Sequence, residues 1–245
     1  QEQIIKNAVV DGTLYNGGLE IRRLSTDHLS GSRLFVKGKI NNFGSVPKAT
    51  KLSLKAETKN INQLIKFMGL NYSPASKHIG KVKFYAEIDG PVLTPSLKLN
   101  LGNSNTTINV SGQLDGLSVV PAVKGLKFQV KAKSTSKLLK IAGIRAINNR
   151  QLGSMNVDGE INGNLMTPSL ALNITAMGGS AAVSGKVNTL PIGETLDLSV
   201  RIIHPEISQL LRTTGGYNPV SKVGSLDLQG RLIGGAESIS LKSIK

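Results

Sequence analysis

The chain has 245 residues, a formal net charge of +15 and no cysteine. The lack of cysteine excludes a disulfide scaffold, a thiolate metal site and a cysteine nucleophile. Hydrophobic residues make up 39% of the chain and charged residues 18%, which is the composition of a folded protein rather than a disordered one. No stretch reaches the roughly 18 consecutive apolar residues of a membrane helix. We therefore expect any anchor or export signal to lie outside this sequence.

The first 30 residues are expected to supply partial strands of an N-terminal repeat (1–30). From residue 34 onward, apolar and polar residues alternate: Leu34, Val36 and Ile40 share one face of a strand, and Lys37 and Lys39 share the other. The same alternation recurs over 81–89, 97–101, 126–132 and 196–202. This period of two is typical of antiparallel strands with one dry face and one wet face.

A short helix is predicted over 60–69. Asn60 suits the N-cap and Gly69 the C-terminal cap, while the residues between them place an apolar stripe at helical spacing, namely Ile61, Leu64, Ile65 and Met68. Two later segments match this helix: Leu138-Leu139-Lys140 and Leu210-Leu211-Arg212. Before the second of them, Pro205 suits the first helical position.

These landmarks recur along the chain in a fixed order. Gly38, Gly112 and Gly185 occupy matching strand sequences at spacings of 74 and 73 residues, and Thr94-Pro95-Ser96-Leu97 recurs as Thr167-Pro168-Ser169-Leu170. No Pro- or Ser-rich linker separates the copies, which favours continuous stacking over separate domains. We predict repeat 1 over 31–104, repeat 2 over 105–179, and repeat 3, which lacks the Thr-Pro landmark, over 180–245.

The predicted fold is mainly β. It is a continuous repeating antiparallel sheet curled into a groove, with units of about 73 residues that each contain four strands and one short helix. Four strands spaced about 4.8 Å apart present more apolar surface than one helix about 10 Å across can cover. Either the sheet curls on itself, or part of the apolar face stays open for another molecule.

Three segments carry a resemblance to a known family. They are Glu20-Ile-Arg-Arg-Leu-Ser-Thr-Asp-His-Leu-Ser-Gly-Ser-Arg-Leu-Phe-Val-Lys-Gly-Lys-Ile40, then Asn-Ile-Asn-Gln-Leu-Ile (60–65), and Gly80-Lys-Val-Lys-Phe-Tyr-Ala-Glu-Ile-Asp-Gly90. Their order resembles the strand–turn–strand pattern of the AsmA-like family, which includes the larger TamB-type proteins. The resemblance extends from about residue 8 to the end of the chain.

The resemblance implies a repeating β-groove protein. Such proteins are anchored in the inner membrane of diderm bacteria, extend into the periplasm and carry phospholipid toward the outer membrane. The sequence departs from the family plan because it has no N-terminal membrane helix. We expect a periplasmic segment whose inner-membrane anchor lies outside this chain, with a role in lipid transport and outer-membrane biogenesis.

The expected partner is a phospholipid or another acyl lipid, and envelope proteins are further candidates. The acyl chains are expected to contact apolar residues that point to one face of the sheet. These are Val36, Ile40, Leu52, Leu54, Val82, Phe84, Leu97, Leu99, Ile108, Val110, Phe128, Val130, Val157, Leu170, Leu172, Val183, Leu198, Val200, Leu226 and Leu228. A structural spacer or protein-interaction scaffold with a closed apolar core is the alternative.

The positive charge is uneven, since residues 31–104 carry 12 basic and 3 acidic residues. A basic surface attracts polyanions, either nucleic acid or an anionic membrane surface, although lysine on outward strand positions also keeps sheets soluble. We expect no nucleic-acid partner, because the tyrosines form no repeated stacking set; they are Tyr15, Tyr72, Tyr85 and Tyr217.

No catalytic, cofactor or metal site is predicted. His28, His78 and His204 lie far apart and lack the spacing of metal ligands, and no phosphate-binding loop or nucleophile motif occurs. We expect a capping or surface role for His204. Asp89 and Asp158 occupy near-equivalent polar positions of two repeats, and we interpret them as solvated side chains rather than as a catalytic pair.

Overall fold

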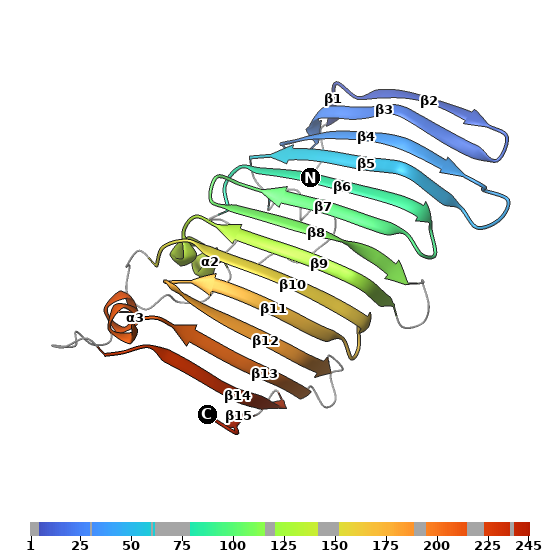
Figure 1. The fold of residues 1–245 in the computed structure, drawn as a ribbon. Coiled ribbons are helices and arrows are strands. Elements are labelled where there is room, and N and C mark those ends of the chain that lie inside the picture. Colours follow the sequence, from blue (N-terminus) through green and yellow to red (C-terminus); the bar gives the residue numbers. More distant parts are fainter. Residues whose placement is uncertain are drawn as a thin grey trace. The chain divides into compact units, whose positions relative to one another are not determined.

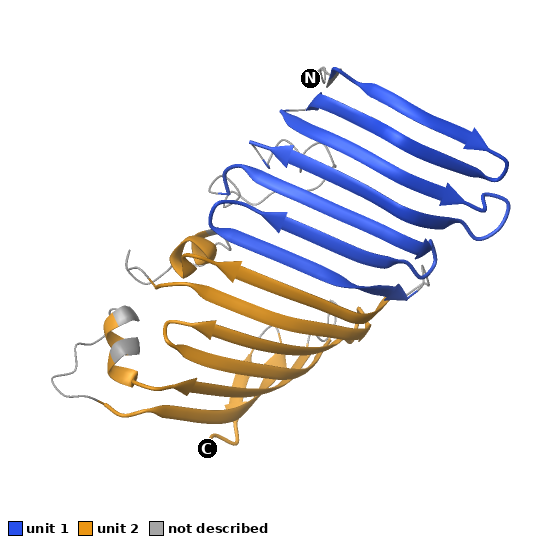
Figure 2. Ribbon diagram, turned by 45° about the horizontal axis from the view of Figure 1, so that its top comes forward, with its two compact units in different colours: residues 1–117, 141–143 blue, residues 118–140, 144–245 orange. Residues whose placement is uncertain are grey.

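The computed structural model describes residues 5–29, 31–59, 61, 79–115, 121–141, 152–188, 195–214, 223–235 and 238–245. Within these ranges the protein is mainly β and its strands pair in antiparallel fashion, which confirms the predicted fold class at that level. The chain divides into two compact units, residues 1–117 with 141–143 and residues 118–140 with 144–245 (Figure 2). The repeat boundaries and the 73-residue unit stay predictions.

Unit 1 contains the strands labelled β1 to β8 in Figure 1. They are β1 (Ile5–Lys6), β2 (Val9–Tyr15), β3 (Gly18–Leu29), β4 (Ser32–Asn41), β5 (Lys48–Thr58), β6 (Val82–Pro91), β7 (Ser96–Gly102) and β8 (Thr106–Asp115). From β3 to β8 each strand pairs with the next one along the chain, and β1 and β2 both pair with β3. No pairing among these described strands joins β8 back to β1 or β2, so the sheet of this unit is open.

Unit 2 follows the same plan. Its elements are β9 (Ala122–Ala132), α2 (Thr135–Ile141, whose last residue is grouped with unit 1), β10 (Met155–Asn164), β11 (Ser169–Ala176), β12 (Gly179–Asn188), β13 (Thr195–His204), α3 (Ile207–Thr214), β14 (Leu226–Gly235) and β15 (Ile239–Lys242). Each strand again pairs with its neighbour in the chain. Apart from Ile61, the helix predicted over 60–69 lies outside the described residues.

The start of α3 differs from the prediction. The helix begins at Ile207, so Pro205 precedes it by two residues and does not occupy its first position. The intervening turn is held by the backbone N–H of Glu206, which donates to Nδ1 of His204 at 3.1 Å. The side chain of His204, at the end of β13, therefore caps the turn from which α3 begins.

Each unit contains a β-bulge whose backbone N–H donates a hydrogen bond to a side chain of the next strand. On β5, Lys51 adopts a positive φ of 45°, and its backbone N–H donates to Oδ1 of Asp89 on β6 at 2.9 Å. On β9, Gly125 has a φ of 57°, and its N–H donates to Oδ1 of Asn162 on β10 at 2.6 Å. A bulged residue loses its ladder partner, so the side-chain oxygen replaces the missing acceptor. Asp89 is thereby given a structural role.

Helices α2 and α3 lie at the ends of strands (Figure 1), and each is hydrogen-bonded to the segment that leads into the next strand. Oγ of Ser136 in α2 accepts a hydrogen bond from the backbone N–H of Leu152 at 3.3 Å, and Oγ of Ser208 in α3 accepts one from Val223 at 2.6 Å. The buried apolar side chains of the described ranges also lie toward strand ends or beside α2; they are Leu29, Ala49, Ala56, Val82, Val123, Ala132 and Leu152. Among the described residues, no buried apolar side chain lies at the middle of a strand.

Candidate functional site

A row of apolar side chains crosses the middle of the unit 1 sheet. Val36 on β4 lies opposite Leu54 on β5, and Leu54 lies opposite Ala86 on β6. The row continues through Leu99 on β7 to Val110 on β8. Directly opposed residues of antiparallel strands have Cβ atoms about 5 Å apart, so neighbouring members of the row are in contact range. The surface formed by this row and the parallel rows beside it is called the apolar face.

Two further rows of unit 1 flank the central one. The first contains Leu34, Ala56, Phe84, Leu101 and Ile108, and the second contains Leu52, Ile88 and Leu97. Strand β2 extends the same face, because Val10 lies opposite Leu24 and Leu14 lies opposite Leu19. Val10 is 79% exposed and Leu14 76% exposed, so the face is open at this edge of the sheet.

The apolar face of unit 2 has a corresponding central row. It runs through Phe128, Gly159, Leu172, Val183, Val200 and Gly230. Its glycines are covered by neighbouring side chains: a Cβ on Gly159 would lie 2.4 Å from Cζ of Phe128 and 2.7 Å from Cδ2 of Leu172. The flanking rows contain Val130, Val157, Ile174, Ala181, Ile202 and Leu228, and also Leu126, Ile161, Leu170, Leu198 and Leu232.

The residues predicted for lipid contact are only partly buried. All of them lie in the described ranges and all but one are half-buried; the exception is Val82, which is 1% exposed. A closed core would bury large aliphatic side chains almost completely. Within each unit, the described residues therefore leave the apolar face accessible.

Strand pairing gathers most of the predicted residues into the rows above. Val82 lies on the same face of β6 as Phe84 but is buried at the start of the strand, opposite Thr58. Leu226 begins β14 opposite the buried His204; it is half-buried and shares the face of Leu228. Sequence reasoning omitted several equal members of the rows, namely Leu34, Leu101, Ile174, Ile202 and Leu232, although the alternation of the strands already marked Leu34, Leu101 and Ile202.

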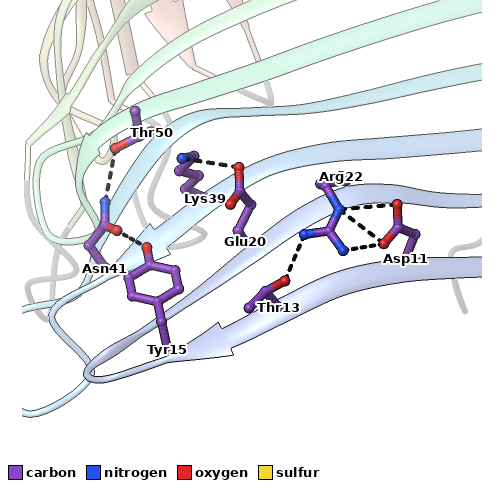
Figure 3. Close-up of polar contacts among 8 residues, drawn as sticks. All are labelled: Asp11, Thr13, Tyr15, Glu20, Arg22, Lys39, Asn41 and Thr50. Carbon is purple, nitrogen blue, oxygen red and sulfur yellow. Dashed lines mark hydrogen bonds and ion pairs between the residues drawn. The ribbon is translucent and has the colours of Figure 1, made fainter.

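The opposite face of the sheet is polar and carries cross-strand ion pairs. In unit 1, Arg22 on β3 contacts Asp11 on β2 at 2.5 Å and Lys39 contacts Glu20 at 3.0 Å (Figure 3). Figure 3 also shows Tyr15 bonded to Asn41, whose amide donates to Oγ1 of Thr50 at 3.2 Å. The hydrogen bonds from Arg22 lower the pKa of Asp11. These contacts join neighbouring strands on the polar face of the sheet.

In unit 2 two arginine–aspartate pairs join β13 to β14. Arg201 binds both carboxylate oxygens of Asp227, at 3.0 and 2.7 Å, and Arg231 binds both of Asp197, at 2.6 Å each. The hydrogen bonds from the arginines lower the pKa of each carboxyl. Paired fork geometry of this kind fixes the register of two strands.

Neither histidine in the described ranges belongs to a cluster of metal-ligating side chains. His204 is 2% exposed rather than at the surface; its Nε2 lies 2.9 Å from the carbonyl oxygen of Met177, and its Nδ1 accepts from Glu206, which is a capping role. His28 is exposed on β3, and His78 lies outside the described residues. The described part of the chain contains no cluster of three or more metal-ligating side chains.

Asp158 takes part in a local hydrogen-bond network, in which Gln129 donates to its Oδ1 at 2.6 Å and Asn156 also contacts it.

Among the described residues, no helix has the length and apolar character needed to cross a membrane. Comparisons with protein-family models, curated proteins and solved structures found no match to this chain. The candidate site therefore depends on its own geometry, and that geometry is an accessible apolar face on each unit.

Proposed function

We propose that this chain binds the acyl chains of phospholipids on its apolar face and acts without catalysis as a segment of a cell-envelope lipid-transport protein. In this proposal it belongs to a periplasmic protein of outer-membrane biogenesis and is built from stacked units of about 73 residues. The observation that carries the proposal is the half-exposed state of the apolar rows across the strands of both units.

The physical basis is the hydrophobic effect. Moving one methylene from water to an apolar surface contributes up to about 0.8 kcal/mol when it is fully buried. A row of aliphatic side chains that crosses several strands offers many such contacts and no polar group that would fix one position. Acyl chains can therefore bind in many registers and slide, while their headgroups remain in water.

Native mass spectrometry of the gently purified protein, followed by lipid extraction, tests this proposal. We expect retained phospholipid. In unit 1, Leu99→Asp should reduce the retained lipid at least about ten-fold, because an uncompensated carboxylate at an apolar contact costs several kcal/mol. Leu172→Asp is the corresponding change in unit 2.

Matched controls lie one residue away on the same strands. Asn100 and Asn173 are exposed and point to the opposite face of β7 and β11. Asn100→Asp and Asn173→Asp add the same single charge, and each should retain lipid at the level of the unaltered protein. A lipid-free unaltered protein, or equal losses in the leucine and asparagine variants, would refute the proposal.

A protein-interaction scaffold is the second candidate, favoured by the edge of unit 1. Along β2 the described residues show pairing with β3 alone, and its apolar side chains Val10 and Leu14 are more than three-quarters exposed, at 79% and 76%. Such an edge can accept a strand from a partner. Chemical cross-linking from β2 to a single envelope protein, combined with a lipid-free apolar face, would favour this function.

A further inference from the structure

Unit 1 contains a hollow of about 1250 Å³ whose walls are formed mainly by side chains of the polar face, opposite the apolar rows. Its central row is Phe35 on β4, Lys55 on β5 and Tyr85 on β6, which are directly opposed across the three strands. We call this surface the basic hollow. Most of its lining side chains point away from the proposed lipid face, although Leu34, Ala56, Phe84 and Leu101 of the apolar rows also border it.

The central row combines one cation with two aromatic rings. Nζ of Lys55 lies 5.9 Å from the centroid of the Tyr85 ring, within the range of a cation–π contact. The hydroxyl of Tyr85 donates to Oε2 of Glu87 at 2.5 Å, and this bond raises the pKa of the tyrosine. The ring is thereby held in place beside the lysine.

Three of the acidic side chains in the basic hollow are already paired, whereas Asp27, which also lines it, accepts a hydrogen bond from Asn7 at 3.3 Å. Glu20 contacts Lys39 at 3.0 Å, Glu87 contacts Lys98 at 3.7 Å, and Glu57 contacts Lys81. By contrast, Lys37 and Lys55 line the hollow without an ion pair to a described carboxylate within 4 Å, and Arg33 and Lys83 act on Glu57 only by longer-range attraction. A concave surface with unpaired cations attracts and concentrates anions.

The corresponding place in unit 2 shows that the sheet does not require this row. The residues 74 and 73 positions after Lys55 and Tyr85 are Gln129 and Asp158. They are directly opposed on β9 and β10, and they form a hydrogen bond of 2.6 Å without a cation or a ring. Solubility and strand pairing alone therefore do not explain Lys55 and Tyr85.

We propose that the basic hollow binds an acidic saccharide chain, with its anionic groups on the unpaired cations and a sugar ring against the aromatic side chains. The hollow is also lined by exposed neutral hydrogen-bonding groups that suit hydroxyls, namely Asn100 and Thr107. The carboxylates of Glu20, Glu57 and Glu87 can accept hydrogen bonds from sugar hydroxyls, which the backbone of a DNA strand does not offer. A nucleic acid would also need a longer series of stacking rings.

Fluorescence anisotropy with a labelled oligogalacturonate tests the proposal, and a neutral malto-oligosaccharide of equal length and an oligodeoxythymidylate serve as comparison probes. We expect the acidic saccharide alone to bind, with an affinity that falls as salt is raised from low to physiological concentration. The triple variant Lys37→Gln, Lys55→Gln, Lys83→Gln should weaken binding at least about ten-fold. Tyr85→Leu should weaken binding of the saccharide without changing its salt dependence.

The matched control removes three exposed lysines from the polar face of unit 2: Lys127→Gln, Lys131→Gln and Lys186→Gln. It lowers the net charge by the same amount and should leave saccharide affinity within about two-fold of the unaltered protein. Equal losses in the two triple variants would overturn the proposal in favour of unspecific charge attraction. Tighter binding of oligodeoxythymidylate would overturn it in favour of nucleic acid. Lipid retention is measured separately, so either proposal can fail alone.

Discussion

The backbone of Gly185 on β12 allows a sharp test of how closely the strands approach one another. Gly185 has a φ of 150°, and a Cβ added there would lie 2.0 Å from the carbonyl oxygen of Asp197 on β13. The obstacle is backbone, so it cannot rotate away. For Gly185→Ala we expect a loss of about 2–6 kcal/mol, which combines roughly 1–3 kcal/mol for the strained φ with 1–3 kcal/mol for forcing two packed segments apart.

Gly159→Ala is the matched control within the same unit. A Cβ at Gly159 would also come close to its neighbours, 2.4 Å from Cζ of Phe128 and 2.7 Å from Cδ2 of Leu172. These atoms are the far ends of side chains that can turn toward the open apolar face. The φ of Gly159 is not in the positive range, and alanine reduces the freedom of the unfolded chain, so we expect a change below about 1 kcal/mol.

Urea unfolding followed by far-ultraviolet circular dichroism measures both variants. We expect the midpoint of Gly185→Ala to fall by about 1 M or more and that of Gly159→Ala to move only slightly. A larger loss for Gly159→Ala than for Gly185→Ala would refute the reasoning, because it would mean that the apolar face is too tightly covered for Phe128 and Leu172 to move.

Further predictions concern the contacts that hold strands and helices together. Ser208→Ala should destabilise unit 2 by about 1–3 kcal/mol, because the backbone N–H of Val223 loses its buried acceptor; thermal unfolding that matches the unaltered protein would contradict this role. Asp197→Asn should lower the melting temperature slightly at neutral pH, because Arg231 loses its partner. Since the pKa of Asp197 is lowered in the folded protein, its contribution is present above the unfolded-state pKa and is lost as the pH falls through the folded value. The melting temperatures of the two proteins should therefore converge in acid and also in high salt. His204→Ala should delay the start of α3 and reduce helical protection in hydrogen exchange, since Glu206 loses its acceptor; unchanged protection at the first turn would argue against the cap.

The sequence determines which face a residue occupies more reliably than where it lies along its strand. Alternation placed Phe84 and Val82 on one face, and strand pairing agrees. Only Phe84 is accessible, however, because the start of β6 is buried, and no local pattern marks that difference. How deeply a residue is buried depends on its position along the strand, because the elements that pack at a strand end are remote in sequence.

Bulges were beyond sequence reasoning for a similar reason. Lys51 has a positive φ although lysine carries no preference for that conformation. The conformation is maintained by a carboxylate on another strand, Asp89, and only the fold brings the two together. Gly125 occupies the matching position in unit 2, and glycine is the residue type that would have suggested a positive φ there.

Pairing between strands that follow one another along the chain also determines how each unit assembles. Most backbone contacts within a unit join residues of the same or adjacent hairpins, so little loop entropy is lost before a contact forms. Folding can nucleate at any hairpin and spread to both sides. By the same reasoning, a hairpin can be gained or lost in evolution while its neighbours keep their partners and their faces.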